Sequence, residues 1–212
     1  MPDAELVRRA AGGEAGAFEA LMRRYNRMLY RTARAILRDD AEAEDALQEA
    51  YLQAYRSLGR FRGEARLSTW LARIVANEAL MRLRKQARRA EIVPMHLDEL
   101  SDMQMDKRPE SCAERGEIRR LLEAQIDALP QAYRAVFMLR AVEELSVEET
   151  AAILAIPAAT VRTRFFRARS LLREALAQKI DLAREDAFAF AGERCDRIVE
   201  NVLRRLAHSE VK

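Results

Sequence analysis

Hydrophobic residues recur at helical spacing along the first half of the chain. One amphipathic pattern spans residues 18–37, and Arg fills many of its polar positions. A second spans about residues 41–57, with Asp39 or Asp40 placed to cap its start. A third follows Ser68 or Thr69, either of which can cap it. Because apolar residues spaced three and four apart are typical of amphipathic helices, the pattern predicts packed helices here.

The pattern stops at residue 90 and resumes near residue 117. Residues 90–114 contain two prolines, three methionines and an excess of acidic residues, with no sustained period. This composition predicts a flexible, mildly acidic linker. Helical spacing then returns and is interrupted at Pro130. Beyond about residue 178, apolar residues at helical spacing predict a short helical extension whose apolar face packs on the preceding domain or docks a regulator.

A short helix, a tight turn and a longer helix are predicted between residues 145 and 172. Ser146 and Glu149 have the spacing of a capping box, which starts the first helix. Pro157 cannot continue that helix, and a new amphipathic pattern begins directly after it. This arrangement is typical of a helix-turn-helix DNA-binding unit.

The second helix of this unit has two distinct faces. Val161, Phe165, Ala168 and Leu172 form the stripe that is expected to pack on the first helix. Arg162, Thr163, Phe166, Arg167 and Ser170 lie on the opposite side, where Arg can bind guanine edges or phosphate. The alternative interpretation is a solvated basic face with Phe166 covered by a neighbouring helix.

Composition agrees with an all-α protein and adds little about its partners. The chain of 212 residues contains only seven Gly and five Pro, and strong helix formers dominate. Its net charge is +3, and the preference for Arg over Lys fits both nucleic-acid binding and a GC-rich genome. Two cysteines without CxxC spacing predict no disulfide framework and no metal site. No apolar run reaches membrane-spanning length, so we expect a cytoplasmic protein without membrane insertion.

Two separate blocks resemble the extracytoplasmic-function sigma factors, the small relatives of the bacterial RNA polymerase specificity subunit. Residues 160–169 (TVRTRFFRAR) look like the family's −35 recognition helix, and Leu129-Pro130 is similar to the entry to that domain. The resemblance implies that −35 duplex DNA is recognised through Arg162, Thr163, Arg164, Phe166, Arg167 and Arg169.

The N-terminal block is independent of the first. Residues 45–55 (DALQEAYLQAY) are similar to the segment that binds core RNA polymerase, and residues 61–77 look like the −10 melting and recognition region. Tyr55 stands where the family commonly has Trp, and Ala159 where it often has Gly. The resemblance implies polymerase contacts from Asp45, Gln48, Glu49 and Leu52. It implies −10 contacts from Phe61, Arg62, Gly63, Glu64, Ala65, Arg66, Leu67 and Asn77.

The basic run that ends this block predicts phosphate contacts near the −10 element, which are independent of sequence and sensitive to salt. These residues are Arg82, Arg84, Lys85, Arg88 and Arg89.

The alternative for Asn77 is a buried polar group that bonds a neighbouring loop carbonyl. By the same resemblance, the acidic linker threads the polymerase cleft that later holds RNA; an ordinary tether is the alternative.

The expected organisation is all-α, with two helical domains. Residues 1–89 would form sigma region 2, residues 90–114 the linker, residues 115–178 sigma region 4, and residues 179–212 the extension. The implied partners are core RNA polymerase, promoter DNA and an anti-sigma factor, with no cofactor.

Two other classes of function were weighed. A stand-alone helix-turn-helix regulator leaves the blocks at residues 45–55 and 61–77 unexplained. An enzyme would need a catalytic constellation, and the sequence has neither a His near a nucleophile nor a Gly-rich phosphate loop. The sequence therefore predicts an initiation factor without catalytic residues.

Overall fold

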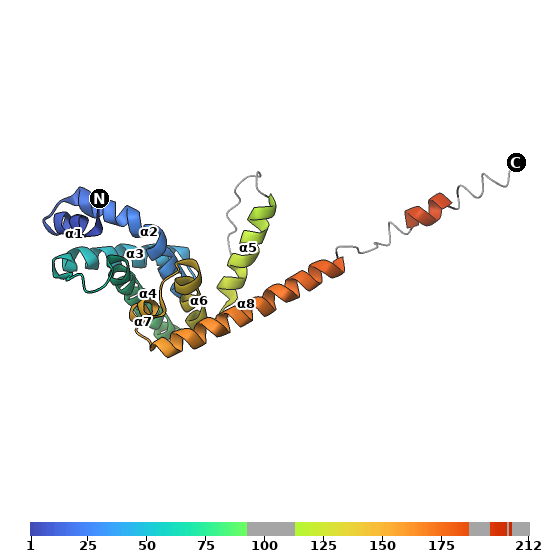
Figure 1. Ribbon diagram of the computed structural model, residues 1–212. Coiled ribbons are helices and arrows are strands. Elements are labelled where there is room, and N and C mark those ends of the chain that lie inside the picture. The colour runs from blue at the N-terminus through green and yellow to red at the C-terminus, as the bar shows by residue number, and fades with distance from the viewer. Residues whose placement is uncertain (93–112, 187–195, 203, 205–212) are drawn as a thin grey trace. The chain divides into compact units, whose positions relative to one another are not determined.

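Every regular element in the described part of the chain is helical. The structure, a computed structural model, describes residues 1–92, 113–186, 196–202 and 204 (Figure 1). It divides into two compact units, Met1–Leu172 and Arg173–Lys212. The all-α prediction is confirmed, while most of the predicted linker lies outside the described residues. In these residues no helix is both long and apolar enough to cross a membrane.

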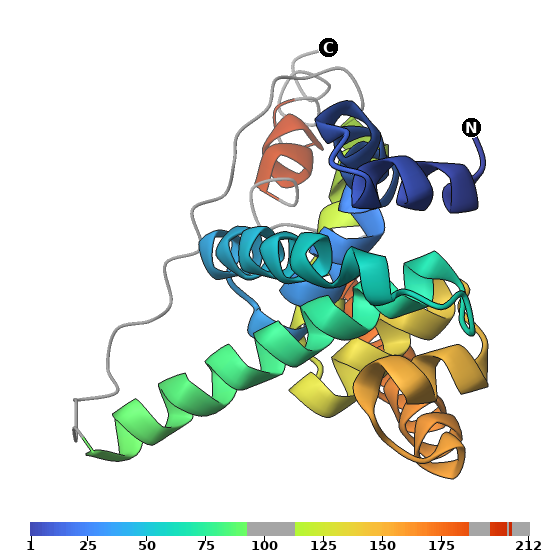
Figure 2. The same cartoon turned by 90° about the vertical axis from the view of Figure 1, so that its left-hand side faces the viewer.

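The N-terminal half folds into four α-helices and one short 3-10 turn. They are α1 (Asp3–Ala11), α2 (Ala15–Leu37), α3 (Asp40–Ser57), η1 (Leu58–Arg60) and α4 (Leu67–Ile92). Helices α2, α3 and α4 pack against one another, and α1 packs on α2 (Figure 2). The hydrophobic spacing had predicted the last three of these helices but not α1.

The predicted caps of α3 and α4 had different outcomes. Asp39 accepts a hydrogen bond from the Glu42 amide at 2.8 Å, which satisfies one of the unpaired amides at the start of α3. The predicted cap of α4 is wrong, because that helix already begins at Leu67 and therefore contains Ser68 and Thr69. Leu67 is buried in the core at this point, so burial of an apolar side chain accompanies the helix start.

The C-terminal half contributes a second group of helices. They are α5 (Ala113–Ala128), α6 (Gln131–Phe137), the π-helical turn η2 (Met138–Val142), α7 (Val147–Leu154) and α8 (Ala158–Asp186). Within the first unit, Leu129 packs with Ala168 and Leu172 of α8 in a small apolar cluster. Helix α8 is 29 residues long, and its part from Arg173 onward belongs to the second unit.

The two groups of helices share one hydrophobic core within the first unit. Ala135, Leu139, Leu145 and Ile153 are buried in the same cluster as the side chains of α1 to α4. Helix α6 packs on α2, and α7 packs on α4. The side chains of the C-terminal group therefore complete the core of the N-terminal group.

The extension is helical where it is described. Residues 196–202 form a helix, and Ile198, Val199 and Val202 on it are exposed. The two expectations for this apolar face, packing on the preceding domain and docking of a regulator, both stay predictions.

The turn between α7 and α8 supplies a test of local strain. Ala155 ends α7 in the left-handed conformation, with φ 51°, which costs a residue with a Cβ about 1–2 kcal/mol. Glycine removes this strain but loses more conformational entropy on folding. We therefore expect Ala155→Gly to raise the free energy of unfolding by a net amount of about 1 kcal/mol, measured in urea titrations. The control is Ala152→Gly at an exposed position inside α7, and this change should lower the free energy of unfolding by about 1 kcal/mol. Equal effects of the two changes would contradict this account.

Candidate nucleic-acid interface

The helix-turn-helix begins with the predicted capping box. The Ser146 hydroxyl accepts a hydrogen bond from the Glu149 amide at 3.0 Å, and the Glu149 carboxylate accepts one from the Ser146 amide at 2.8 Å. The hydrogen bond from the Ser146 amide holds the pKa of Glu149 below its usual value. The carboxylate therefore stays charged at the positive end of the helix dipole and fixes the direction of α7.

The face of α8 that the sequence predicts to be apolar is buried, but Phe165, Ala168 and Leu172 pack on Phe137 of α6 and on Leu129 rather than, as expected from the sequence, on the first helix of the unit. Val161 and Ala168 are fully buried, and Leu172 is nearly so. Phe165 stacks on Phe137, with ring centroids 6.3 Å apart, and the guanidinium of Arg140 lies 5.5 Å from the Phe165 ring. This face anchors α8 and leaves the opposite face turned outward.

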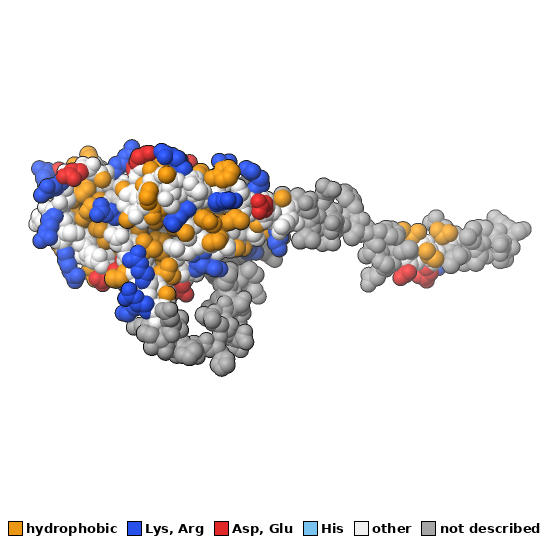
Figure 3. All heavy atoms as spheres, turned by 90° about the horizontal axis from the view of Figure 1, so that it is seen from below, with side chains coloured by type: hydrophobic (Ala, Val, Ile, Leu, Met, Phe, Trp, Pro, Cys, Tyr) orange, Lys and Arg blue, Asp and Glu red, His pale blue; other side chains and the backbone are white. Residues whose placement is uncertain are grey.

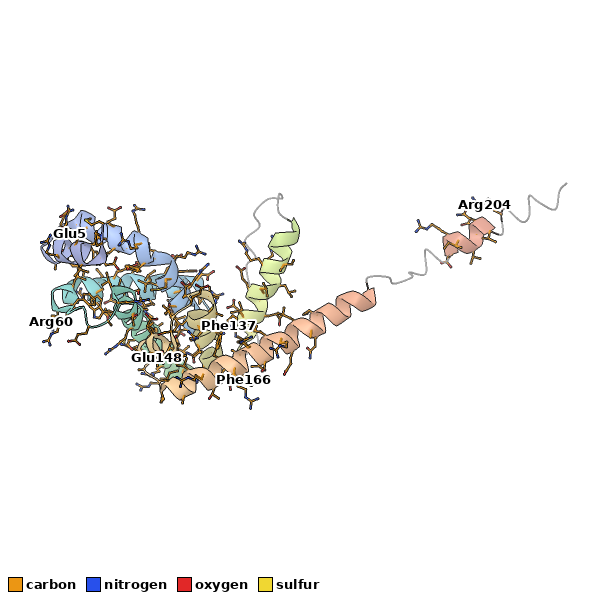
Figure 4. All side chains as sticks on the ribbon, in the orientation of Figure 1. Glu5, Arg60, Phe137, Glu148, Phe166 and Arg204 are labelled. Atoms are coloured by element: carbon orange, nitrogen blue, oxygen red, sulfur yellow. The ribbon has the colours of Figure 1, made fainter. Side chains whose placement is uncertain are left out.

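The outward face carries four of the six predicted −35 residues. Phe166 is 68% exposed, so no described helix covers it, which contradicts the alternative interpretation (Figure 4). Arg162 and Arg167 are exposed on the same side. Arg162 lies 3.7 Å from Glu148 in a solvent-exposed pair, which leaves it free to exchange this partner. Thr163 is exposed and donates its hydroxyl to the Ala159 carbonyl at 3.0 Å.

The other two predicted −35 residues lie differently. Arg164 is half-buried and lines a cavity of about 430 Å³ together with Asn77 of α4. Arg169 is exposed, with its guanidinium 5.9 Å from the Phe165 ring. Of the six predicted −35 residues, Arg164 alone is therefore not fully exposed.

The predicted −10 loop connects η1 to α4. Gly63 has φ 74°, a left-handed conformation that glycine adopts without a steric penalty. The five residues Arg62, Gly63, Glu64, Ala65 and Arg66 are all exposed. The loop is held at its ends, because Phe61 packs on Trp70 at 5.3 Å between centroids and Leu67 is buried.

Asn77 lies on the surface of α4. It is exposed, so the alternative interpretation of a buried polar group is wrong. Leu80 and Arg84 line the same cavity on α4, and Leu154, Ile156 and Arg164 line it from the helix-turn-helix. The structure thus places a candidate −10 residue opposite the DNA-binding unit.

The basic run on α4 divides into paired and exposed residues. Arg82 donates to Glu78 at 2.9 Å and lies 3.4 Å from Glu42 of α3, so it joins two helices. Arg84, Lys85 and Arg88 are exposed, whereas the side chain of Arg89 lies outside the described set. Basic side chains outnumber acidic ones on the face in Figure 3.

Sequence reasoning missed the buried partner of Arg82. Glu78 is 5% exposed and accepts hydrogen bonds from Arg82 and from Gln53 of α3, the latter at 3.1 Å. Its spacing of four residues from Arg82 is the one available signal. Glu78 holds α3 against α4 and positions the predicted polymerase-binding helix relative to the predicted −10 residues.

The predicted polymerase-binding residues share one side of α3. Asp45 and Gln48 are exposed, and Glu49 is half-buried. Leu52 is 52% exposed although it is a large apolar side chain. Acidic and amide groups around an exposed leucine form a small amphipathic surface, which is typical of a protein-binding site. No group of three or more potential metal ligands gathers anywhere in the described residues.

The chain matches two protein families by sequence. Sigma-70 region 2 matches residues 21–89, and Sigma-70, region 4 matches residues 119–172. The RNA polymerase sigma-H factor of Pseudomonas aeruginosa is 34% identical over 180 residues, covering 82% of this chain and 93% of the relative. The ECF RNA polymerase sigma-E factor of Escherichia coli K12 is 34% identical over 180 residues, covering 81% and 93%.

A solved structure is also similar. CnrH, in complex with the cytosolic domain of CnrY, superposes with a TM-score of 0.58 at 26% sequence identity, covering 83% of this chain and 97% of that chain. The chain therefore belongs to the extracytoplasmic-function (ECF) sigma factors of bacterial RNA polymerase, which are transcription initiation factors.

Proposed function

We propose that this sigma factor recognises its promoter at two points and opens the DNA at one of them. The outward face of α8, with Phe166 exposed between Arg162 and Arg167, is the observation that carries the proposal. An exposed aromatic among arginines can contact a thymine methyl while the arginines bind guanine edges or phosphates. This face would bind the −35 duplex.

The loop at residues 61–66 and Asn77 would bind the −10 element as a single strand. A melted base must leave the stack and enter a site that bonds its edge. The exposed loop supplies backbone and charged groups, and the exposed amide of Asn77 can bond a base edge. Arg84, Lys85 and Arg88 would bind neighbouring phosphates, a contribution that weakens with salt.

The partners follow from the two surfaces. The side of α3 that carries Asp45, Gln48 and Leu52 would bind core polymerase. The protein would therefore act in the cytoplasm, where the polymerase is, and it would catalyse no reaction of its own. We propose residues 1–89 and 115–178 as the two functional domains, joined by residues 90–114. Because the similar CnrH is solved in complex with a protein partner, the cytosolic domain of CnrY, we also propose control by a protein that binds this sigma factor, of the anti-sigma type that the sequence resemblance implies.

Run-off transcription with core polymerase on a promoter library tests this function. Polymerase with the protein should yield promoter-specific transcripts that polymerase alone does not give. Absence of such transcripts at every salt concentration would reject the proposal. Retention of duplex binding without polymerase stimulation would favour a stand-alone regulator.

Asn77→Ala should impair promoter opening while −35 binding is retained. The amide bonds a base only after the strand separates, so its loss should lower open-complex formation about tenfold, the scale of one good polar base contact. Permanganate reactivity of unpaired thymines measures the opening, and Arg73→Ala at another exposed position of α4 is the control. Unchanged melting in Asn77→Ala would remove this residue from the −10 site.

A further inference from the structure

Four polar side chains from three helices converge on one cavity in the first unit. The cavity has a volume of about 430 Å³, and it is lined by Asn77 and Arg84 of α4, Gln131 of α6 and Arg164 of α8. We call it the α4–α8 cavity. The proposed function assigns Asn77 and Arg84 to promoter contacts, and it gives no role to Gln131, to Arg164 or to the cavity itself.

The walls of the α4–α8 cavity carry positive charge that no carboxylate balances. Arg84 is exposed and Arg164 is half-buried. Neither guanidinium has an ion pair or a hydrogen bond to any described residue. None of the described residues that line the cavity is acidic. An anion in the cavity would therefore be attracted by both arginines without displacing an existing partner, and guanidinium groups bind phosphate through strong charge-assisted hydrogen bonds.

Two side-chain amides add hydrogen-bonding groups at the same place. Asn77 and Gln131 each offer N–H donors and a carbonyl acceptor. Neither amide has a hydrogen-bond partner within the part of the chain that the structure describes. Such amides pair with the edge of a nucleobase, as Asn and Gln do with adenine. The α4–α8 cavity can therefore bond a polar ring edge as well as an anion.

Another part of the wall is apolar, and the volume limits the size of a ligand. Leu80, Leu154 and Ile156 line the cavity and are half-buried. Small-molecule sites combine such apolar surface with a few convergent polar groups, in volumes of about 300–1,000 Å³. The volume of about 430 Å³ lies near the lower end of this range. The cavity therefore fits one small molecule with a flat, partly apolar body.

Three simple classes of ligand would leave part of this lining unused. Inorganic phosphate would engage the two arginines but neither the amides nor the apolar wall. A fatty acid would leave both amides without a partner, and a neutral nucleoside would leave the arginines without a counter-charge. A nucleoside monophosphate matches all three parts of the lining, because it joins a phosphate to a flat ring with a polar edge.

We propose that the α4–α8 cavity binds a free nucleoside monophosphate, with its phosphate on Arg84 and Arg164 and its base edge on Asn77 and Gln131. Binding of the nucleotide does not depend on the proposed function. Its consequence does rest on that function: a bound nucleotide covers Asn77 and therefore competes with the single-stranded −10 element. A nucleotide within that strand has the same chemistry, so a variant at Gln131 is needed to separate the two sources.

Calorimetric titration of the full-length protein with AMP, GMP, CMP and UMP tests the site. At least one of these nucleotides should bind with a stoichiometry of one. The corresponding nucleoside and inorganic phosphate should each bind at least about tenfold more weakly, because each lacks part of the polar contacts. Absence of binding for all four nucleotides at millimolar concentration would overturn the proposal. Equal affinity for inorganic phosphate would also overturn it, because the base would then contribute nothing.

Charge reversal locates the phosphate. Arg84→Glu and Arg164→Glu should each weaken nucleotide binding at least about tenfold, because each removes a charge-assisted contact and adds repulsion. Arg73→Glu on α4 and Arg167→Glu on α8 make the same change at exposed positions that do not line the cavity. These two controls should keep the affinity within about twofold, since solvent and salt screen exposed charges. Equal losses in all four variants would show a general charge effect and would overturn the site.

Gln131→Ala separates a free nucleotide from a nucleotide of the promoter strand. Gln131 is half-buried and lies outside the proposed −10 surface. The variant should weaken the mononucleotide about fivefold, the scale of one hydrogen bond, and should leave binding of a single-stranded −10 oligonucleotide unchanged. Equal losses for both ligands would show that the promoter strand itself enters the cavity and would overturn the free-nucleotide site. Failure of run-off transcription would reject the promoter function and leave the nucleotide titration standing.

Discussion

Arg167→Ala and Arg162→Ala are each expected to weaken binding of the −35 duplex by about 1–3 kcal/mol, the value of one good contact to a base. This range corresponds to about a five- to 150-fold loss of affinity. Both side chains are exposed on α8 and their removal leaves no buried partner unpaired. Fluorescence anisotropy with duplexes that carry each base substitution in turn measures the loss and its dependence on sequence.

The form of the loss tells base reading from phosphate binding. If the arginine reads a base, the alanine variant should bind the preferred duplex more weakly and should discriminate less between the four bases at one position of the duplex. If the arginine binds a phosphate, the alanine variant should bind all duplexes more weakly to the same extent. The slope of log affinity against log salt concentration should then fall by about one. Arg23→Ala removes another exposed arginine, from α2, and should leave duplex binding unchanged. Equal losses in Arg23→Ala and Arg167→Ala would point to a general charge effect.

The faces of the helix-turn-helix were predictable because their causes are local. A capping box needs two residues three apart, and the structure has both of its hydrogen bonds. The stripe of Val161, Phe165 and Ala168 follows from helical periodicity, and in the structure Val161 and Ala168 are buried and Phe165 is half-buried. Such features depend on residues within a few positions of one another, so one sequence is enough to infer them.

The cap of α4 shows where local reasoning stops. Ser68 and Thr69 have the right side chains for a cap, yet the helix begins at Leu67, which packs into the core. Burial of a leucine contributes about 1.5–3 kcal/mol, more than a typical cap contributes. Tertiary packing therefore sets the start of this helix, and the sequence pattern alone does not contain that information.

The contacts of Arg134, a buried arginine of α6, were unpredictable for a related reason. Its main partner, the Ala35 carbonyl, is 99 residues away in sequence and is a backbone group. No side-chain pattern marks a carbonyl as an acceptor, since every residue carries one. The contacts between Arg31 and Glu143 and between Arg34 and Asp127 likewise join distant residues. The candidate DNA-binding residues could be inferred from the sequence, but the way in which the fold covers some of them could not.

Leu52→Arg is expected to reduce the affinity for core polymerase by at least about 2 kcal/mol, or about 30-fold. Leu52 is 52% exposed on α3 and lies on the same side as Asp45 and Gln48. Apolar side chains at the centre of an interface contribute most of the binding free energy, and a buried unpaired cation opposes binding further. Sedimentation or native gels with core polymerase measure the affinity directly.

Two properties make Leu52→Arg a decisive test. Because Leu52 is exposed, the change should leave the free energy of unfolding within about 0.5 kcal/mol of its original value. Ala11→Arg, which adds the same cation at an exposed position of α1, should retain polymerase binding. Loss of binding in Leu52→Arg alone locates the polymerase surface on α3. Unchanged binding in both variants would place that surface elsewhere on the molecule and would leave the exposure of Leu52 without a functional reason.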